Sequence, residues 1–401
     1  MKRILFVDDE DKVLDGIRRM LYADRKRWEL EFAVGGEAAL QACERGSFDI
    51  VISDMRMPGM DGAMLLTHVR DRFPSTVRII LSGYSELALT ARAVPVAHRF
   101  LTKPCDPAEL RSTIERVCVL QELLSGEEIR RLVGSVGELP SLSGIYASLS
   151  QAIRNPGTPL KEIADIVEQD MAMTAKVLQL TNSAFFGLTR KVTSVHSAVS
   201  YLGMETIENL VLFTEAFRTF MPYKRLPPSE YESLQQHSQQ TARIAGKLPV
   251  DLKTREVLIL AALLHDIGRL VLASKMPDQF CAARALAQER GCEPFEAEEE
   301  LLGTSHAEIG AYLLGLWGIP HLAVEAIAHH HRPTRISHTG FDTSAALYVA
   351  DLLAHQPMGG ADDLPAIELR ESERICLEKL GVLDRLPEFR KLAASCPLES
   401  K

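Results

Sequence analysis

Short apolar runs alternate with helical patterns along the first 120 residues of the chain. The runs lie at residues 4–7, 29–34, 49–53, 77–81 and 98–102, where the sequence reads ILFV, ELEFAV, DIVIS, VRIIL and HRFLT. Between them, apolar residues recur every three or four positions, as Leu65, Leu66 and Val69 do, which is the spacing of an amphipathic helix. Strands that alternate with helices predict a doubly wound α/β domain with a five-stranded parallel sheet.

The strand pattern ends near residue 105, and the rest of the chain has helical spacing. A helix that begins at Pro107 carries apolar residues on to Leu124, close to Gly126. Such residues need a second surface to cover them, either the helical domain or a second copy of the chain. The predicted organisation is an α/β domain at 1–120, a linker helix at 121–135, an all-helical bundle at 136–356 and a helical tail at 357–401.

Composition and charge narrow the classes of function. Of 401 residues, 46% are hydrophobic and 25% are charged, and the formal net charge is -9. An acidic chain has no basic field to attract nucleic-acid phosphates, and no run approaches the ~20 apolar residues of a membrane span. Seven scattered cysteines without a CxxC pair indicate a reduced interior. We therefore expect a cytoplasmic protein that binds neither nucleic acid nor membrane.

Polar residues follow four of the five predicted strands. Asp8 and Asp9 come after the first strand, Asp54 after the third, Ser82 after the fourth and Lys103 after the fifth. The carboxyl ends of parallel strands share one edge of the sheet, where chemistry gathers in such folds. Close carboxylates repel each other unless a cation neutralises them, and Mg2+ prefers oxygen ligands. The pattern predicts a Mg2+ site at which one carboxylate accepts a phosphoryl group.

Residues 1–120 resemble a response-regulator receiver domain, which has a flavodoxin-like fold. The resemblance lies in VDDE (7–10), DMRMPGMDG (54–62), LSGYS (81–85) and FLTKP (100–104). It implies that a histidine kinase phosphorylates Asp54. It also assigns the neighbouring roles by position: Mg2+ ligands Asp9, Asp54 and the Arg56 carbonyl, water-mediated support from Asp8, the switch pair Ser82 and Phe100, phosphate contact by Lys103, and a cis peptide bond before Pro104.

Histidine and aspartate residues recur along the helical half, at positions that face inward on predicted helices. They are His237, His265, Asp266, His306, His330, His331 and Asp351. His265 and Asp266 close an almost wholly apolar helical stretch, Val257 to Leu272, where an ionised aspartate needs a partner. Ser305 and Glu308 form a capping box that opens a helix at His306.

Two interpretations of this series stay open. Imidazole and carboxylate ligands suit Fe, Mn or Zn, and a metal pair can activate water for phosphodiester hydrolysis. Alternatively, the side chains form a hydrogen-bonded polar cluster that fixes the register of the helices. The run of histidines at 329–331 also ends a helix before Pro333, where imidazolium favours the helix dipole.

The order of these residues resembles the HD superfamily, and stretches at 178–188, 194–207 and 301–320 narrow the resemblance to the HDOD domain. This resemblance covers about residues 136–356 and implies a bundle of five or more helices that serves as a signalling or interaction module. Compared with HD-GYP phosphodiesterases, the chain lacks the GYP segment, and Arg269 and Arg332 replace a Lys and a Glu. A positive charge beside metal ligands opposes cation binding, so we do not expect hydrolysis of cyclic dinucleotides.

A further group, Asn182, Ser183, Phe185 and Phe186, is either a partner surface or a polar cap before an aromatic core contact. The whole pattern is interpreted as a two-component response regulator whose receiver controls an HDOD output by contact. Its expected partners are a sensor histidine kinase, a protein bound by the HDOD domain and a second copy of the chain. The alternative is a receiver-gated, metal-dependent phosphohydrolase. A transcription factor is not supported, because no basic recognition helix follows the receiver.

Overall fold

The computed structural model describes residues 1–83, 93, 95–124, 126–137, 139, 143–155, 157–182, 191–218, 228–338, 340–356 and 369–394. Ser183, Phe185 and Phe186, which the sequence suggests as a partner surface, lie outside the described residues. Asn182 is described, and its side chain bonds to the backbone of Val192 through both its amide nitrogen and its oxygen, at 2.8 and 2.7 Å. Asn182 therefore holds the backbone together at the end of a helix.

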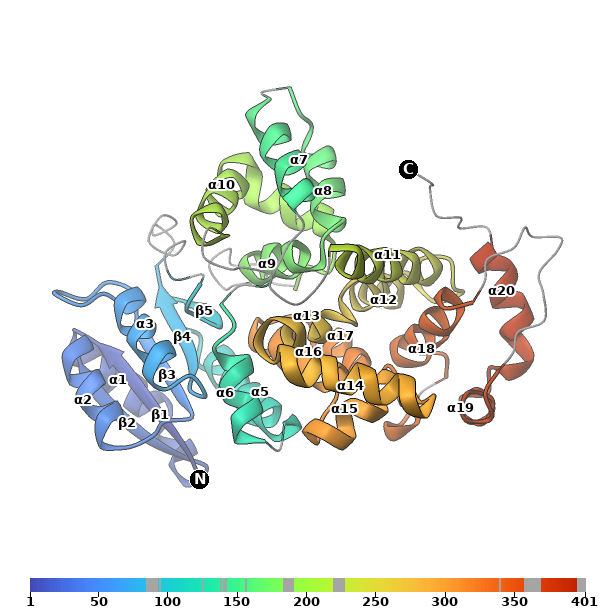
Figure 1. The fold of residues 1–401 in the computed structure, drawn as a ribbon. Coiled ribbons are helices and arrows are strands. Elements are labelled where there is room, and N and C mark those ends of the chain that lie inside the picture. Colours follow the sequence, from blue (N-terminus) through green and yellow to red (C-terminus); the bar gives the residue numbers. More distant parts are fainter. Residues whose placement is uncertain are drawn as a thin grey trace.

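The N-terminal domain is a five-stranded parallel sheet with helices on both faces (Figure 1). The strand order is β2-β1-β3-β4-β5, and each predicted strand is confirmed. The strands are β1 (Lys2–Asp8), β2 (Trp28–Val34), β3 (Ile50–Asp54), β4 (Val77–Ser82) and β5 (Arg99–Thr102). The helices are α1 (Asp11–Met20), α2 (Gly36–Arg45), α3 (Gly62–Arg72) and α5 (Pro107–Leu123). β3 and β4 are buried along their whole length, as expected where helices cover both faces of a sheet.

The rest of the described chain is helical, as predicted. Its first part comprises α6 (Glu127–Gly134), α7 (Ser143–Arg154), α8 (Leu160–Glu168), α9 (Met171–Thr181), α10 (Val195–Arg218) and α11 (Pro228–Ala245). The second part comprises α12 (Leu252–Leu264), α13 (Ile267–Lys275), α14 (Pro277–Arg290), α15 (Pro294–Leu302), α16 (His306–Leu316), α17 (His321–Ala328), α18 (Thr343–Ala354), α19 (Glu371–Lys379) and α20 (Leu386–Ala394). A kink at Gly203, with φ of 72°, divides α10.

The apolar stretch from Val257 to Leu272 is not one helix, as the sequence predicted, but two. α12 ends at Leu264 and α13 begins at Ile267, because His265 and Asp266 turn toward other polar groups. The segment Leu252–Lys275 has the length and composition of a membrane span, but 78% of its most apolar window is buried inside the structure. It packs as the core helices of soluble proteins do.

Arg78 fastens the linker helix α6 to the base of the sheet. Its guanidinium donates hydrogen bonds to the carbonyl oxygens of Val96, Thr76 and Gly134, at 2.6, 3.0 and 2.6 Å. The side chain is 1% exposed, and burial lowers its pKa to about 9. Gly134 must lack a side chain, because a Cβ there would lie 2.3 Å from the Pro74 oxygen. The linker is thus docked onto the receiver rather than suspended between two domains.

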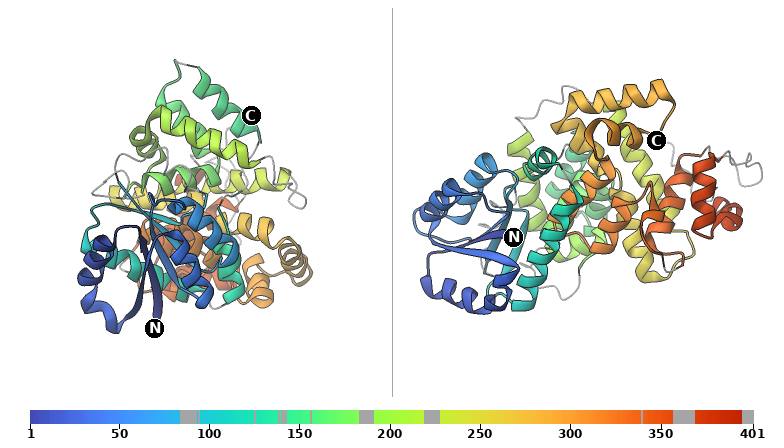
Figure 2. Two further views of the ribbon diagram at one scale, coloured as in Figure 1. Left: turned by 90° about the vertical axis from the view of Figure 1, so that its left-hand side faces the viewer. Right: turned by 90° about the horizontal axis from the view of Figure 1, so that it is seen from below.

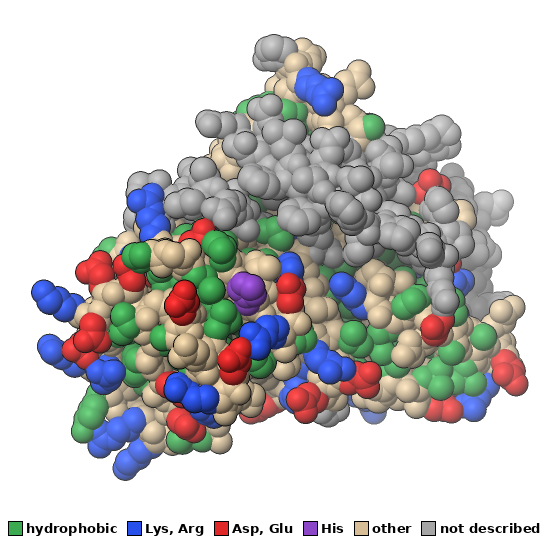
Figure 3. Space-filling view, turned by 60° about the vertical axis from the view of Figure 1, so that its left-hand side comes forward, with side chains coloured by type: hydrophobic (Ala, Val, Ile, Leu, Met, Phe, Trp, Pro, Cys, Tyr) green, Lys and Arg blue, Asp and Glu red, His purple; other side chains and the backbone are tan. Residues whose placement is uncertain are grey.

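A second contact joins β5 and α5 to the helical domain (Figure 2). Arg99 on β5 donates hydrogen bonds to the carbonyl oxygens of Gly315 and Leu316 at the end of α16. Leu120 on α5 packs so closely on α16 that a Cβ at Gly315 would lie 2.5 Å from it. The helical domain therefore covers the apolar end of α5, and these residues do not require a second copy of the chain. On the face that Figure 3 shows, positively and negatively charged side chains are interspersed.

Candidate functional sites: an acidic pocket and a histidine centre

The acidic pocket lies where β1, β3 and β5 end at the same edge of the sheet. Asp8 and Asp54 are buried, with 1% and 6% exposure, whereas Asp9 is exposed. The Lys103 ammonium lies between the two buried carboxylates, 2.7 Å from Asp8 Oδ2 and 2.5 Å from Asp54 Oδ1. Burial raises the pKa of Asp54, and the hydrogen bond from Lys103 opposes that shift. Backbone amides contribute as well, since Arg56 N donates to Asp54 Oδ2 at 3.0 Å.

The remaining predicted receiver residues surround this pocket. Ser82 ends β4 and is 1% exposed, and Phe100 lies on β5 and is 3% exposed. The peptide bond between Lys103 and Pro104 is cis, as the resemblance implies. Gly62 passes so close to the phosphoacceptor strand that a Cβ would lie 2.2 Å from the Asp54 carbonyl oxygen. The sequence could not show this contact, because it depends on the path of the loop after β3.

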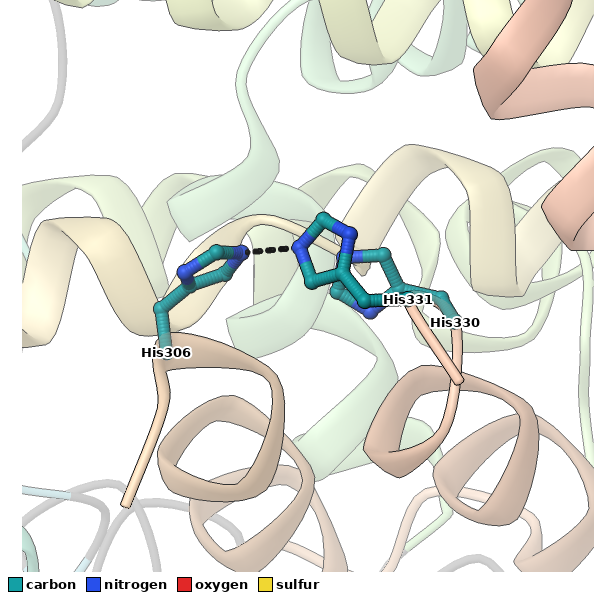
Figure 4. A group of neighbouring side chains, drawn as sticks. All are labelled: His306, His330 and His331. Atoms are coloured by element: carbon teal, nitrogen blue, oxygen red, sulfur yellow. Dashed lines mark hydrogen bonds between the residues drawn. The ribbon is translucent and has the colours of Figure 1, made fainter. Parts of the chain in front are cut away.

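The seven histidines and aspartates of the helical half converge on one centre. His237 comes from α11, His265 and Asp266 from the α12–α13 junction, His306 from the start of α16, and Asp351 from α18. His330 and His331 follow α17, and Figure 4 shows them facing His306. Three sets have ligand atoms within 4.8 Å of one another: His306 with His330 and His331, His237 with His265 and Asp351, and His265 with Asp266 and His330.

Outer hydrogen bonds orient three of the imidazoles toward the centre. Nδ1 of His265 lies 2.8 Å from the Ala262 oxygen, and Nδ1 of His330 lies 2.7 Å from the Ile327 oxygen. Because a carbonyl only accepts, each Nδ1 carries a proton. The Nε2 of His265 faces Asp351 at 3.5 Å. His330 Nε2 is buried and has no hydrogen-bond partner among the described residues. Burial lowers the pKa of His330 to about 3, so the lone pair persists at neutral pH.

Glu298 on α15 orients the third imidazole, and no sequence pattern pointed to this residue. Its Oε2 accepts hydrogen bonds from both His306 Nδ1 and the His306 backbone nitrogen, each at 2.7 Å. Burial lowers the pKa of His306, but Glu298 and Asp266 more than compensate and raise it to about 9. Glu298 lies in the run EAEEE, and only its fold position, at 2% exposure, separates it from its exposed neighbours. His355, also missed, lies 3.4 Å from Asp351.

The two arginines that the sequence placed near the ligands are both paired. Arg269 Nη1 lies 3.1 Å from Asp266 Oδ2. Arg332 turns to Glu299 at 2.8 Å and lies over the Phe295 ring, so a carboxylate offsets the positive charge that the sequence places beside the ligands. Burial raises the pKa of Asp266, but Arg269 and the neighbouring histidines bring it well below its usual range.

A cavity of about 1020 Å³ opens onto the centre. Asp266, His306, His331 and Asp351 lie on its inner wall, and Arg370 and further residues through Lys379 form part of its outer wall. The capping box predicted at the start of α16 is confirmed, since Ser305 and Glu308 bond reciprocally. This cap and Glu298 both fix the end of the helix that presents His306 to the cavity.

Comparisons with known proteins match both halves of the chain. Residues 4–115 match the response regulator receiver domain, and residues 139–333 match the HDOD domain. The response regulator UvrY of Escherichia coli (strain K12) is 31% identical over 153 residues, which are 38% of this chain and 70% of that protein. An uncharacterized protein of Treponema pallidum is 26% identical over 226 residues, which are 55% of this chain and 43% of that protein.

A solved structure supports the fold over about two thirds of the chain. A virulence factor from Campylobacter jejuni aligns with 68% of this chain and 98% of its own, with a TM-score of 0.53 and 21% identity. The chain spans less than half of the length of the first curated relatives, at 43%, 39% and 32%. The HDOD match ends at residue 333, so Asp351 and the α19 wall of the cavity lie beyond it.

Proposed function

Because this chain belongs to the response regulators, with a receiver domain followed by an HDOD domain, we propose that phosphorylation of Asp54 by a sensor histidine kinase controls the HDOD domain by contact. The observation that carries this proposal is that one strand, β5, serves both ends of the process. Its carboxyl end leads into Lys103 beside Asp54, and its other end carries Arg99, which bonds to α16.

Phosphorylation changes the charge balance of the acidic pocket. A phosphoryl group adds about -1.5 to -2 charges, beside a single ammonium that is shared by two carboxylates. Lys103 would then contact the phosphate, Ser82 would move toward it and Phe100 would follow into the space that Ser82 leaves. Since Phe100 is the next residue after Arg99, this movement reaches the contact with the HDOD domain.

Mg2+ fits the chemistry of this pocket. Asp9, Asp54 and the Arg56 carbonyl offer the oxygen ligands that Mg2+ prefers, and we assign them as its ligands, with Asp8 acting through water. Bound Mg2+ would offset charge on the phosphoryl oxygens. A Mg2+ titration of wild type should saturate, and Asp9→Ala should weaken it. An unchanged titration in that variant would place the metal elsewhere.

Amide hydrogen exchange tests control by contact. The full chain should be treated with Mg2+ and a small phosphodonor, and exchange should be followed in β5, α6 and α16. We expect a change at these elements in wild type and none in Asp54→Asn under the same treatment. If phosphate is incorporated but exchange at all three elements stays the same, the receiver does not act on the HDOD domain through these contacts.

A second candidate function is a receiver-gated metal centre in the HDOD domain. The specific observation in its favour is His330 Nε2, a buried lone pair without a partner in a ring whose other nitrogen is fixed. The residues that would hold Fe, Mn or Zn are His237, His265, Asp266, His306, His330, His331 and Asp351. Such a metal supplies Lewis acidity and an activated water. The chain itself orients His265, His306 and His330 through outer hydrogen bonds, and it places His306 and His331 on the wall of the cavity.

Metal analysis separates this candidate from a purely structural cluster. Purified protein should contain Fe, Mn or Zn, and His265→Ala should not. We expect no release of product from cyclic dinucleotides, with or without phosphorylation, because the chain lacks the GYP segment. Turnover that disappears in His265→Ala would make the chain an enzyme.

We also propose a cytoplasmic location and an unidentified protein partner for the HDOD domain. The six described cysteines are free, in keeping with a reducing compartment. A homodimer remains a further proposal. A pull-down with phosphorylated and unphosphorylated chain would reveal a partner that prefers one state.

A further inference from the structure

α16 connects the two domains through its two ends. At its first residue, His306 faces His331, with 2.9 Å between the two Nε2 atoms. At its last residues, the carbonyls of Gly315 and Leu316 accept hydrogen bonds from Arg99 of the receiver. Eleven residues separate these ends, a span of about 16 Å at a helical rise of 1.5 Å per residue. One helix therefore carries a centre residue at one end and a receiver contact at the other.

Arg99 supplies what the end of α16 otherwise lacks. The last four carbonyls of a helix have no partner within it, and they form the negative end of the helix dipole. Three of them accept local backbone hydrogen bonds: Trp317 N bonds to Leu313 O and Ile319 N to Leu314 O, both at 3.0 Å, and Gly318 N bonds to Gly315 O at 3.2 Å. Leu316 O receives Arg99 Nε at 3.2 Å. The guanidinium thus adds both hydrogen bonds and a positive charge at this end.

α16 is positioned along its length by close packing. Ten of its eleven residues are buried. Where it crosses α13, a Cβ at Gly268 would lie 1.9 Å from the His306 oxygen, so the two backbones are in direct contact. Interiors packed this closely transmit displacement rather than absorb it. A shift at Leu316 will therefore reach His306.

The receiver end of this connection begins at the phosphoacceptor. Lys103 follows β5 directly and contacts Asp54, and Arg99 is the first residue of the same strand. The strand pairs with β4 from Ile79 to Ser82, so its residues are held in register. One strand and one helix in series join Asp54 to His306.

We propose that Arg99 is a positioning residue for the histidine centre: by holding the C-terminal end of α16, it makes the placement of His306, and hence the metal affinity of the centre, depend on the phosphorylation state of Asp54. This inference rests on the proposed function, in particular on a metal-binding centre and on phosphorylation of Asp54. Between two linked sites, the coupling commonly changes affinity by about 5-fold to 150-fold.

The test is the Zn2+ affinity of the full chain, measured against a competing chelator with and without a phosphodonor. Mg2+ is kept at a saturating concentration so that Zn2+ does not bind in the acidic pocket. The His330→Ala variant measures the background of Zn2+ bound at other sites. Asp54→Asn with the phosphodonor controls for the reagent. In wild type we expect the affinity of the centre to change about 5-fold or more on phosphorylation.

Two variants perturb the end of α16 in different ways. Arg99→Met removes the charge and the hydrogen bonds, whereas Gly315→Ala keeps Arg99 and pushes α16 away from Leu120. Both should bind Zn2+ and accept phosphate, but neither should show the change in affinity. Arg72→Met is the matched control, because Arg72 pairs with Glu44 on the receiver surface, and it should behave as wild type.

The possible results separate the inference from the proposed function. Equal Zn2+ affinities in the two states of wild type would overturn the inference and leave the metal centre standing. A change that persists in both Arg99→Met and Gly315→Ala would overturn the role of Arg99 and α16. No Zn2+ binding above the His330→Ala background would overturn the metal centre and the inference together.

Discussion

The acidic pocket and the histidine centre are both buried clusters of ionisable groups, but they balance their charges differently. In the pocket, one ammonium from Lys103 contacts Asp8 and Asp54 directly. In the centre, Asp266 and Asp351 are surrounded by imidazoles, and His330 Nε2 has no partner among the described residues. Both buried carboxylates of the pocket contact a cation of the chain itself, whereas the centre leaves a lone pair unused.

This difference indicates what each cluster responds to. A triad of one ammonium and two carboxylates changes when one member gains negative charge, as phosphorylation of Asp54 would achieve. A fixed lone pair in a buried site costs free energy until something accepts it, and a metal ion does so. The pocket is thus suited to a covalent charge change, and the centre is suited to a ligand.

The strongest test of the role of the acidic pocket removes the carboxylate that accepts the phosphoryl group. Asp54→Asn should lose phosphate incorporation completely, because the amide cannot form the acyl phosphate. Intact mass after treatment with Mg2+ and a small phosphodonor measures this loss. Asp71→Asn, on the exposed surface of α3, should incorporate phosphate as wild type does. Equal incorporation in wild type and Asp54→Asn would remove the pocket from the proposed function.

Variants of the neighbouring residues His329 and His330 test whether the histidine centre binds a metal. His330→Ala removes the unpartnered nitrogen and should lower Zn2+ affinity by more than about 100-fold, since even outer residues of metal sites contribute 10- to 100-fold. His329 is only partly buried and lies outside the three ligand sets, so His329→Ala should leave the affinity unchanged. Similar affinities in the two variants would show that the centre is a structural cluster.

A variant of Glu298 tests whether the orientation of His306 matters for metal binding, because Glu298 contacts His306 but is not a proposed ligand. Glu298→Gln keeps an acceptor for the His306 backbone but removes the carboxylate that faces His306 Nδ1. Zn2+ affinity should fall by about 10- to 100-fold, while the urea midpoint changes little. Glu300→Gln, which alters an exposed ion pair with Arg290, is the control. A normal affinity in Glu298→Gln would mean that Glu298 serves only as a helix cap.

The smallest expected effect is a loss of stability when Arg78, which docks α6 on the receiver, is replaced. Arg78→Met leaves the Val96 and Thr76 carbonyls without their side-chain donor and leaves the Gly134 carbonyl with His98 alone, and unsatisfied buried groups cost about 1–3 kcal/mol each. We expect at least ~2 kcal/mol of lost stability by urea unfolding, and under ~0.5 kcal/mol for the exposed Arg72→Met. Equal losses in the two variants would show that the docking of α6 contributes nothing to stability.

The sequence predicted the sheet better than it predicted the surroundings of the sites. All five strands follow from apolar runs, because a buried parallel strand needs a continuous apolar segment. The seven histidines and aspartates of the centre were found because they interrupt apolar helices. The break between α12 and α13 was missed, since His265 and Asp266 have no helix-breaking signature.

Long-range partners lay outside the reach of sequence reasoning. Glu298 is one of several similar glutamates, and only the packing of α15 on α16 selects it. Arg99 and Arg78 look like ordinary charged residues near strand ends, yet their partners lie 217 and 56 positions away. The partner of Arg332 could not be read from the sequence for the same reason, because the fold brings Glu299 to it.

The docking of α6 also determines where the chain can be cut. A fragment that stops at residue 120 would retain Arg78 and His98 but lose Gly134, whose oxygen both side chains contact. Its guanidinium would then keep Val96 and Thr76 but lose its partner in α6. A fragment that continues through Val136 would keep the linker helix and this contact. The polar network at the base of the receiver therefore includes a residue of the segment that leads to its output, and a cut chosen from the sheet alone would divide that network.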